Sequence, residues 1–158
     1  MPRTSAAEAA RPIVIRSITE AAALHDRTVE AEHLLLAVLR DPRLPAARAF
    51  ADAGFAADWW QHALAEERRE TLRSAGIESV DDARLVATPS GKRPTWGASA
   101  REALKRGSLH AVERGHRHRM DDVDVTLGIL DAQLGTIARI AARTGLDARA
   151  LAGRLRAA

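Results

Sequence analysis

Apolar residues recur at helical spacing along most of the chain. In the first such segment, about residues 12–25, Val14, Ile18 and Ala21 fall on one face of a helix, and Pro12 fits the first helical position. Similar patterns predict further helices over residues 30–40, 45–53, 56–76, 98–114, 123–131, 134–144 and 147–156. No stretch alternates apolar and polar residues cleanly over six or more positions, so the pattern predicts an all-α protein.

Breaks in this pattern divide the chain into two units. Pro, Gly and Ser concentrate in residues 76–95, which predicts a linker. The first unit then covers about residues 6–75 and the second about 96–156. A shift of 91 positions takes Gly54-Phe55 to Gly145-Leu146, and it takes Leu34, Leu36, Val38 and Leu39 to Val125, Leu127, Ile129 and Leu130.

This self-similarity indicates two copies of one four-helix unit. Each copy is short for an independent core, so we expect both copies to pack into a single pseudo-symmetric domain over residues 1–158.

Composition narrows the function classes. The chain is 46% hydrophobic, which can supply a core, and it has no Cys, which excludes disulfides and thiolate catalysis. No run approaches the roughly 20 apolar residues of a membrane span, and the N-terminus has no long apolar segment, so we expect a cytoplasmic protein. The net charge of +3 does not by itself indicate a nucleic-acid partner.

The repeat, with the stretch EAEHLLLAVL at residues 30–39, the DPRLP loop, PAARAF and the glycine before Phe55, resembles a known domain. It is similar to the N-terminal domain of Clp chaperones, the AAA+ unfoldases of the ClpA, ClpB and ClpC type, and ClpC is closest in type. The first copy matches from Ile13 to Leu64. The second matches from Trp96 to Leu155, with one extra residue in its loop near residue 118. The resemblance implies a fold of two four-helix repeats that binds substrate proteins, adaptors or regulatory peptides for a Clp ATPase.

The ATPase itself is not expected here. A phosphate-binding P-loop needs G-x-x-x-x-G-K-[ST], and Gly91-Lys92 in TPSGKRP lacks the first glycine and the Ser/Thr. We therefore expect a non-enzymatic domain without a cofactor, either free-standing or part of a longer chain.

In ClpC-type members a threonine and a glutamate help to form pockets for arginine-phosphate marks. The positions aligned with the threonine hold Ala7 and Gly97, and the glutamate of the second copy becomes Val123. Only Glu32 matches. A carboxylate can grip a guanidinium, but the phosphate needs donors of its own, so these residues disfavour phosphoarginine recognition.

The antibiotic and adaptor surface of the family is better matched. Trp96, Arg101 and Lys105 occupy positions where family members place an aromatic residue, a basic residue and an acid, and Arg11 matches the basic residue of the first copy. Lys105 inverts the expected charge. The resemblance therefore predicts a peptide- or protein-binding site that contains Arg11, Glu32, Trp96, Arg101 and Lys105. The alternative is a solvated helical face with one packed indole.

Two other patterns carry candidate chemistry. Histidines and aspartates gather between residues 110 and 124, which is metal-type chemistry, but arginines lie among them and would repel a cation. The residues are His110, His116, His118, Asp121, Asp122 and Asp124. We expect a polar loop and no metal. The basic run at residues 105–119 could hold phosphates, but it lacks interleaved aromatics, which disfavours nucleic acid as a partner.

Two functions fit these features best. The domain could be an adaptor or accessory factor for a Clp ATPase, or a decoy that sequesters cyclic peptide antibiotics aimed at that ATPase. Within EAEHLLL, we expect the leucines to form a buried helix. Glu30 and Glu32 suit the positive end of its dipole, and His33 should pack or hydrogen-bond there.

Overall fold

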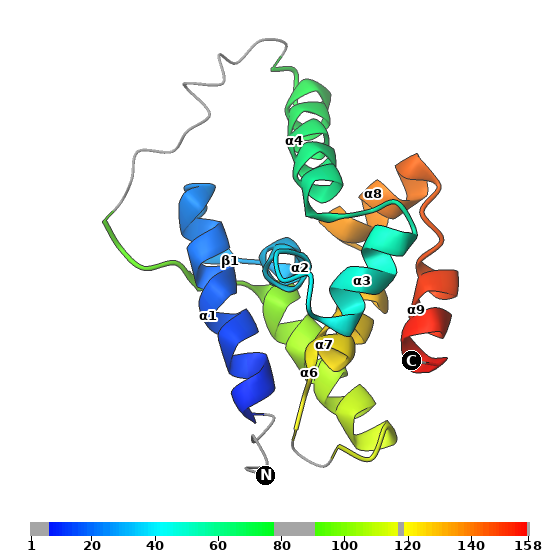
Figure 1. The fold of residues 1–158 in the computed structure, drawn as a ribbon. Helices are drawn as coiled ribbons and strands as arrows, with labels where there is room; N and C mark the ends of the chain where they lie inside the picture. The colour runs from blue at the N-terminus through cyan, green and yellow to red at the C-terminus, as the bar shows by residue number, and fades with distance from the viewer. Residues whose placement is uncertain (1–6, 78–90, 117–118, 158) are drawn as a thin grey trace.

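The computed structural model describes residues 7–77, 91–116 and 119–157, with side chains from Ala10 onward. The first copy comprises α1 (Ala7–Ala23), β1 (Thr28–Val29), α2 (Ala31–Leu39), α3 (Pro45–Asp52) and α4 (Ala57–Ser74). The second comprises β2 (Thr95–Trp96), α6 (Ala98–Glu113), α7 (Asp122–Leu130), α8 (Thr136–Thr144) and α9 (Ala148–Ala157) (Figure 1). The all-α prediction is confirmed. Most of the predicted linker, residues 78–90, lies outside the described residues.

A two-residue strand pair is the feature that the pattern did not predict. β1 and β2 are parallel, with Thr28 opposite Thr95 and Val29 opposite Trp96. Two residues are too few for an alternating pattern to reveal a strand. The pair lies just before α2 and α6, so it sets the first turns of these two helices side by side.

The predicted start of the first helix was wrong. α1 begins at Ala7, so Pro12 lies inside the helix rather than at its first position. Proline lacks an N–H, so the carbonyl of Glu8 loses its usual helical donor. The preceding stretch is rich in alanine, the best helix former, which favours continuing the helix past this defect.

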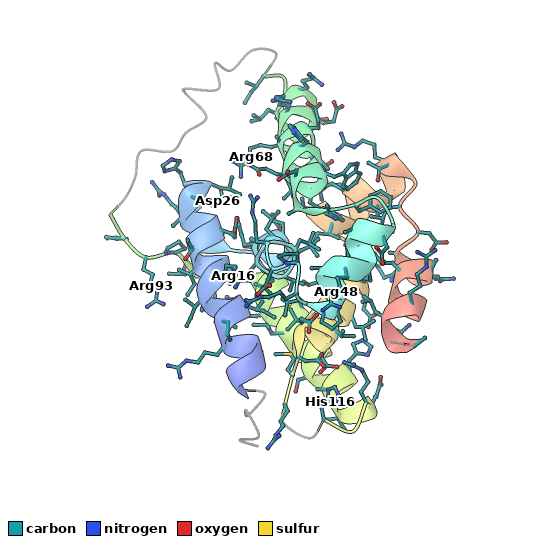
Figure 2. All side chains as sticks on the ribbon, viewed as in Figure 1. Arg16, Asp26, Arg48, Arg68, Arg93 and His116 are labelled. Atoms are coloured by element: carbon teal, nitrogen blue, oxygen red, sulfur yellow. The ribbon has the colours of Figure 1, made fainter. Side chains whose placement is uncertain are left out.

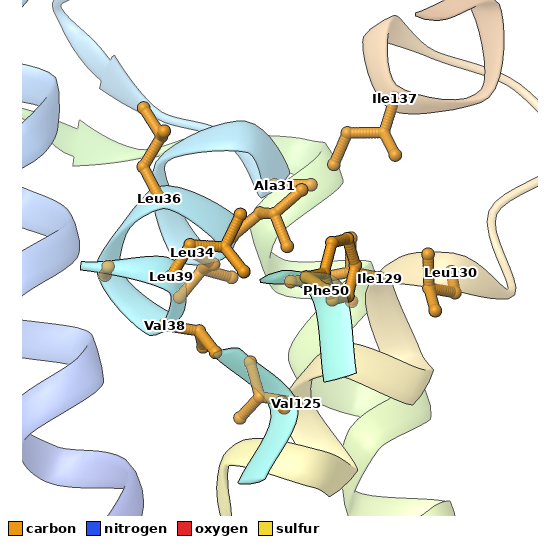
Figure 3. Packing of buried hydrophobic residues seen from close by; sticks show 14 of the residues in the cluster. Ala31, Leu34, Leu36, Val38, Leu39, Phe50, Val125, Ile129, Leu130 and Ile137 are labelled. Atoms are coloured by element: carbon orange, nitrogen blue, oxygen red, sulfur yellow. The ribbon is translucent and has the colours of Figure 1, made fainter. Parts of the chain in front are cut away.

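The core belongs to both copies. In α2 every residue except Glu32 is buried, and in α7 all nine residues are buried. Figure 1 shows α2 end-on at the centre of the molecule, with α1, α3, α4, α6 and α7 around it. Side chains of α2 such as Leu34 and Val38 share one cluster with Phe50 of α3 and with Val125 and Ile129 of α7 (Figure 3).

The internal repeat extends to a polar contact between helices. The guanidinium of Arg16 in α1 donates to the carbonyl oxygen of Ala37 in α2, at 2.9 Å. Arg106 in α6 donates in the same way to the carbonyl oxygen of Gly128 in α7, at 2.8 Å. Arg106 is 90 positions after Arg16, and Gly128 is 91 positions after Ala37. The offset between the two copies therefore grows by one residue in the loop between their first and second helices.

His33 is a structural residue at the start of α2. The backbone N–H of Glu30 donates to His33 Nδ1 at 2.9 Å. With Nδ1 accepting, the ring proton is on Nε2, which lies 3.1 Å from Asp26 Oδ2. Asp26 also accepts a hydrogen bond of 2.9 Å from the guanidinium of Arg68 in α4. Figure 2 shows these two side chains between α1 and α4. The prediction of a hydrogen-bonded His33 at this junction is confirmed.

The second copy keeps this contact with the two chemical groups exchanged. Asp124 stands where the repeat places His33, and it accepts the backbone N–H of Asp121 at 3.0 Å. His116 stands where the repeat places Asp26, and its Nδ1 lies 3.0 Å from Asp124 Oδ2. Each copy therefore has a histidine–aspartate pair at this place, but the histidine and the aspartate occupy opposite positions in the two copies.

A second ion pair is also exchanged between the copies. Arg40 at the end of α2 lies 3.5 Å from Glu20 of α1. At the equivalent positions, Asp131 at the end of α7 lies 2.6 Å from His110 of α6. The base and the acid have changed helices, but each pair still joins the first and second helices of its copy.

Candidate binding surface on the first helix of each copy

The exposed face of α1 carries an open hollow of about 590 Å³ that is lined by Arg11, Pro12, Ile15, Arg16 and Thr19. Ile15 is 53% exposed. Arg16 is held by the Ala37 carbonyl and lies 3.5 Å from Asp41. Arg11 is exposed and makes no hydrogen bond or ion pair with any other residue that the structure describes. It is therefore the cation of this hollow that a ligand could engage.

Three of the predicted residues lie in β2 and in the N-terminal half of α6. Trp96 in β2 is half-buried and packs against the core cluster. Arg101 and Lys105 are exposed and lie one helical turn apart, so their side chains share a face. Arg101 Nε donates only to the carbonyl of Gly97, at 3.3 Å, and Lys105 pairs with no other described residue.

Glu32 is a half-buried acid in the first turn of α2. Burial is the main cause that raises the pKa of its carboxyl, and the nearby carboxylates of Glu30 and Asp26 add to it. A hydrogen bond to its own backbone and the neighbouring His33 lower the pKa of the Glu32 carboxyl, but by less than burial raises it. No other described residue forms a hydrogen bond or ion pair with this side chain. A half-buried carboxylate without such a partner can form an ion pair with a cationic group of a ligand, such as a guanidinium.

Glu30 has a role that the sequence did not indicate. Its carboxylate lies at the N-terminus of α6, where it accepts from the Ser99 hydroxyl at 2.5 Å and from the Ser99 backbone N–H at 3.2 Å. The Ser99 hydroxyl in turn accepts the backbone N–H of Ala31 at 2.9 Å. No local spacing relates residues 30 and 99, so only the structure could reveal this contact.

The Glu30 contact also accounts for the small residue at position 97. A side chain on Gly97 would overlap the Glu30 carboxylate. Gly97 is the position that aligns with the threonine of the resembled repeat. Here the N-terminus of α6 is already satisfied by an internal carboxylate, which would repel a second anion at the same place.

The five predicted residues come from several elements of the fold. No hydrogen bond or ion pair joins any two of them within the described parts of the chain. Arg11 and Arg101 are instead equivalent in the repeat, 90 positions apart, so each copy presents one exposed arginine on its first helix. The candidate surface is therefore two related faces, one on α1 and one on α6.

The histidine and aspartate cluster is neutralised from within the chain. His116, Asp121 and Asp124 offer ligand atoms within 4.8 Å of one another. Arg114 already lies among them, 3.0 Å from Asp121 Oδ1 and 2.7 Å from Asp124 Oδ1. Burial alone would raise the pKa of Asp124, but hydrogen bonds from Asp121, His116 and Arg114 outweigh it and the pKa is lowered.

The other histidines do not join this cluster. His110 instead lies beside Asp131, and residue 118 is outside the described residues. Because a guanidinium already pairs with both aspartates of the cluster, this geometry favours a structural ion-pair network over a metal site.

The basic run at residues 105–119 is similarly engaged. Arg106 donates to the Gly128 carbonyl, Arg114 pairs with two aspartates, and His110 pairs with Asp131. Within the described part of this run, the cations left exposed by these contacts are Lys105 and Arg119, which weakens the case for a nucleic-acid partner. None of the helices that the structure describes is both long and apolar enough to cross a membrane.

Comparisons with known proteins agree with the fold. No family model matches the sequence, and no curated protein matches it. Among solved structures, the chain is similar to the N-terminal domain of the caseinolytic protease associated chaperone ClpD from Arabidopsis thaliana, with a TM-score of 0.64 and 18% identity. The match covers 95% of this chain and 91% of that one. The chain therefore has the all-α fold of a Clp N-terminal domain, built from two four-helix repeats.

Proposed function

We propose that this protein is a non-enzymatic module that binds proteins or peptides, and that it acts as an adaptor or accessory factor for a Clp ATPase. The observation that carries the proposal is the likeness to the ClpD N-terminal domain over nearly the whole chain. That relative is a chaperone associated with a protease by its own description. The two repeats contain no recognisable P-loop, so a binding role suits this domain better than ATP hydrolysis.

The surface chemistry agrees with recruitment. Arg11, Arg101 and Lys105 are exposed and have no carboxylate partner among the described residues. Unpaired cations attract acidic segments of a partner protein, and nearby exposed apolar side chains such as Ile15 help to fix the register of these segments. We propose Arg11, Glu32, Trp96, Arg101 and Lys105 as the residues that contact such partners.

An affinity-tagged chain incubated with extract of its own cells tests the adaptor role. We expect mass spectrometry to identify a Clp ATPase or its client proteins among the captured proteins. Arg101→Glu with Lys105→Glu should abolish this capture. Arg149→Glu with Arg154→Glu, two exposed arginines on α9, should leave it intact. Recovery of neither a Clp ATPase nor its clients by the unmodified chain would overturn the proposal.

The decoy function remains the second candidate because the half-buried Trp96 directly precedes Gly97, whose carbonyl accepts a hydrogen bond from Arg101 Nε at 3.3 Å. A partly exposed aromatic next to a cation suits the apolar and polar faces of a cyclic peptide. Calorimetry with cyclic peptides that bind ClpC decides this function. An absence of binding heat rules the decoy out, and heat that Trp96→Ala does not reduce shows that the peptide binds elsewhere.

A further inference from the structure

Two apolar side chains on α6 are exposed without a structural reason. Leu109 is 60% exposed and Val112 is 59% exposed. They are two of the five large apolar residues that are exposed within the described parts of the chain. Three residues apart on one helix, their side chains are neighbours, so they form one apolar patch.

The internal repeat shows that the fold does not need this patch. A shift of 90 positions relates Leu109 to Thr19 and Val112 to Ala22 on α1. Thr19 and Ala22 are exposed as well. The same four-helix unit therefore forms with a small or polar residue at both positions, and the aliphatic residues of the second copy are not required for its packing.

Unpaired cations lie on the same face. Arg101 and Lys105 precede Leu109 by two turns and one turn of α6, and successive turns are about 5.4 Å apart along a helix. Neither cation has a carboxylate partner among the described residues. Glu102 and Glu113 border the face on one side, and Glu113 lies 3.2 Å from His110.

We infer that this face of α6, formed by Arg101, Lys105, Leu109 and Val112, docks an amphipathic helical segment of a partner protein that carries aliphatic residues followed by carboxylates. Leu109 and Val112 supply the apolar contact, and the two cations select acidic groups one to two turns away. The C-terminal turns of α6 lie at one end of the molecule, below α7 in Figure 1. The inference does not depend on the partner being a Clp ATPase.

A synthetic peptide tests this inference directly. The probe is a fluorescent 14-residue helix with leucines at helical spacing and glutamates one and two turns beyond them. Its counterpart carries lysines in place of the glutamates. Fluorescence anisotropy should show saturable binding of the glutamate peptide, and about tenfold weaker binding of the lysine peptide.

The protein variants follow from the repeat. Leu109→Thr with Val112→Ala gives α6 the residues of the first copy and should weaken binding of the glutamate peptide by about tenfold. The matched control, Thr71→Ala with Ala65→Ser, changes two exposed residues of α4 and should bind within about twofold of the unmodified chain. Circular dichroism confirms that each variant folds.

Three results would overturn the inference. The first is no binding of the glutamate peptide at millimolar concentration. The second is equal binding by the Leu109→Thr, Val112→Ala variant. The third is self-association in sedimentation equilibrium that this double substitution abolishes, which would assign the face to a second copy of the chain.

Discussion

At the scale of single residues, the two copies differ where α6 crosses α7. A Cβ on Gly128 would overlap the carbonyl oxygen of Ala103 and lie 2.5 Å from the Gly107 backbone nitrogen. The first copy has Ala37 and Ser17 where the second has Gly128 and Gly107. The second copy therefore depends on glycine for a helix crossing that the first makes with side chains present.

This dependence predicts a large effect from one methyl group. Gly128→Ala should lower the free energy of unfolding by about 2–3 kcal/mol, because backbone atoms on α6 must move to admit it. Gly153→Ala on α9 is the control. Nothing lies within 4 Å of a Cβ there, and alanine should raise stability by about 0.5–1 kcal/mol. Urea unfolding measures both, and equal effects would contradict the crossing geometry.

The lowered pKa of Asp124 predicts that the stability of the fold depends on pH. Its pKa is lowered below the usual 3.8, because the hydrogen bonds it accepts outweigh its burial. A carboxyl with a lowered folded pKa stabilises the fold above pH 3.8, and that contribution is lost as the pH falls through the lowered value. Asp124→Asn should therefore reduce the free energy of unfolding by about 3 kcal/mol at pH 7.

The same variant should lose its disadvantage in acid. The difference between Asp124→Asn and the unmodified chain should shrink as the pH falls below 3.8, because protonated Asp124 makes no ion pair. Thermal unfolding scans between pH 2 and 7 would show the two curves converging. A constant difference across this range would mean that the charge of Asp124 contributes nothing.

At the scale of elements, the exchanged ion pairs predict a rescue. His110→Glu alone places a carboxylate against Asp131 and should cost about 1 kcal/mol. Adding Asp131→Arg recreates the acid and base arrangement of Glu20 and Arg40 and should restore most of the loss. Urea unfolding of the two single variants and the double variant gives the coupling energy. Strict additivity would show that the two helices do not interact through this pair.

The elements themselves were largely predictable from the sequence. Buried positions such as Leu34 and Val125 repeat at helical spacing, and this local signal located the helices and the two copies. Pro12 was misplaced because the alanine-rich stretch before it has no apolar stripe to mark it as helical. The β1–β2 pair is too short to produce a pattern, and it depends on residues far apart in the chain.

The candidate site was predictable only where its residues share one helix. Arg101 and Lys105 lie four positions apart, so helical spacing alone puts them on one face. The Glu30 to Ser99 contact could not be predicted, because it joins residues from different copies. Helical spacing also cannot show whether a face of a helix is exposed. The exposure of Leu109 and Val112 could therefore be known only from the packing of α6 in the structure.

At the scale of the whole molecule, several contacts join the copies. Arg139 of α8 donates to Glu67 of α4 at 2.5 Å, and Glu67 is buried. Asp122 at the start of α7 accepts the backbone N–H of Ala46 at 2.8 Å. With the shared core around α2, these contacts mean that neither copy can unfold without exposing buried groups of the other.

This coupling predicts that the chain unfolds as one cooperative unit. In a Trp96→Phe variant the remaining indoles, Trp59 and Trp60, both lie in α4, so fluorescence follows the first copy alone. Circular dichroism follows the helices of both copies. The two signals should give the same urea midpoint and slope, because a domain with one core loses its structure in a single transition. If fluorescence changed at a separate midpoint, the copies would be independent units, and the shared cluster around α2 would contribute little to stability.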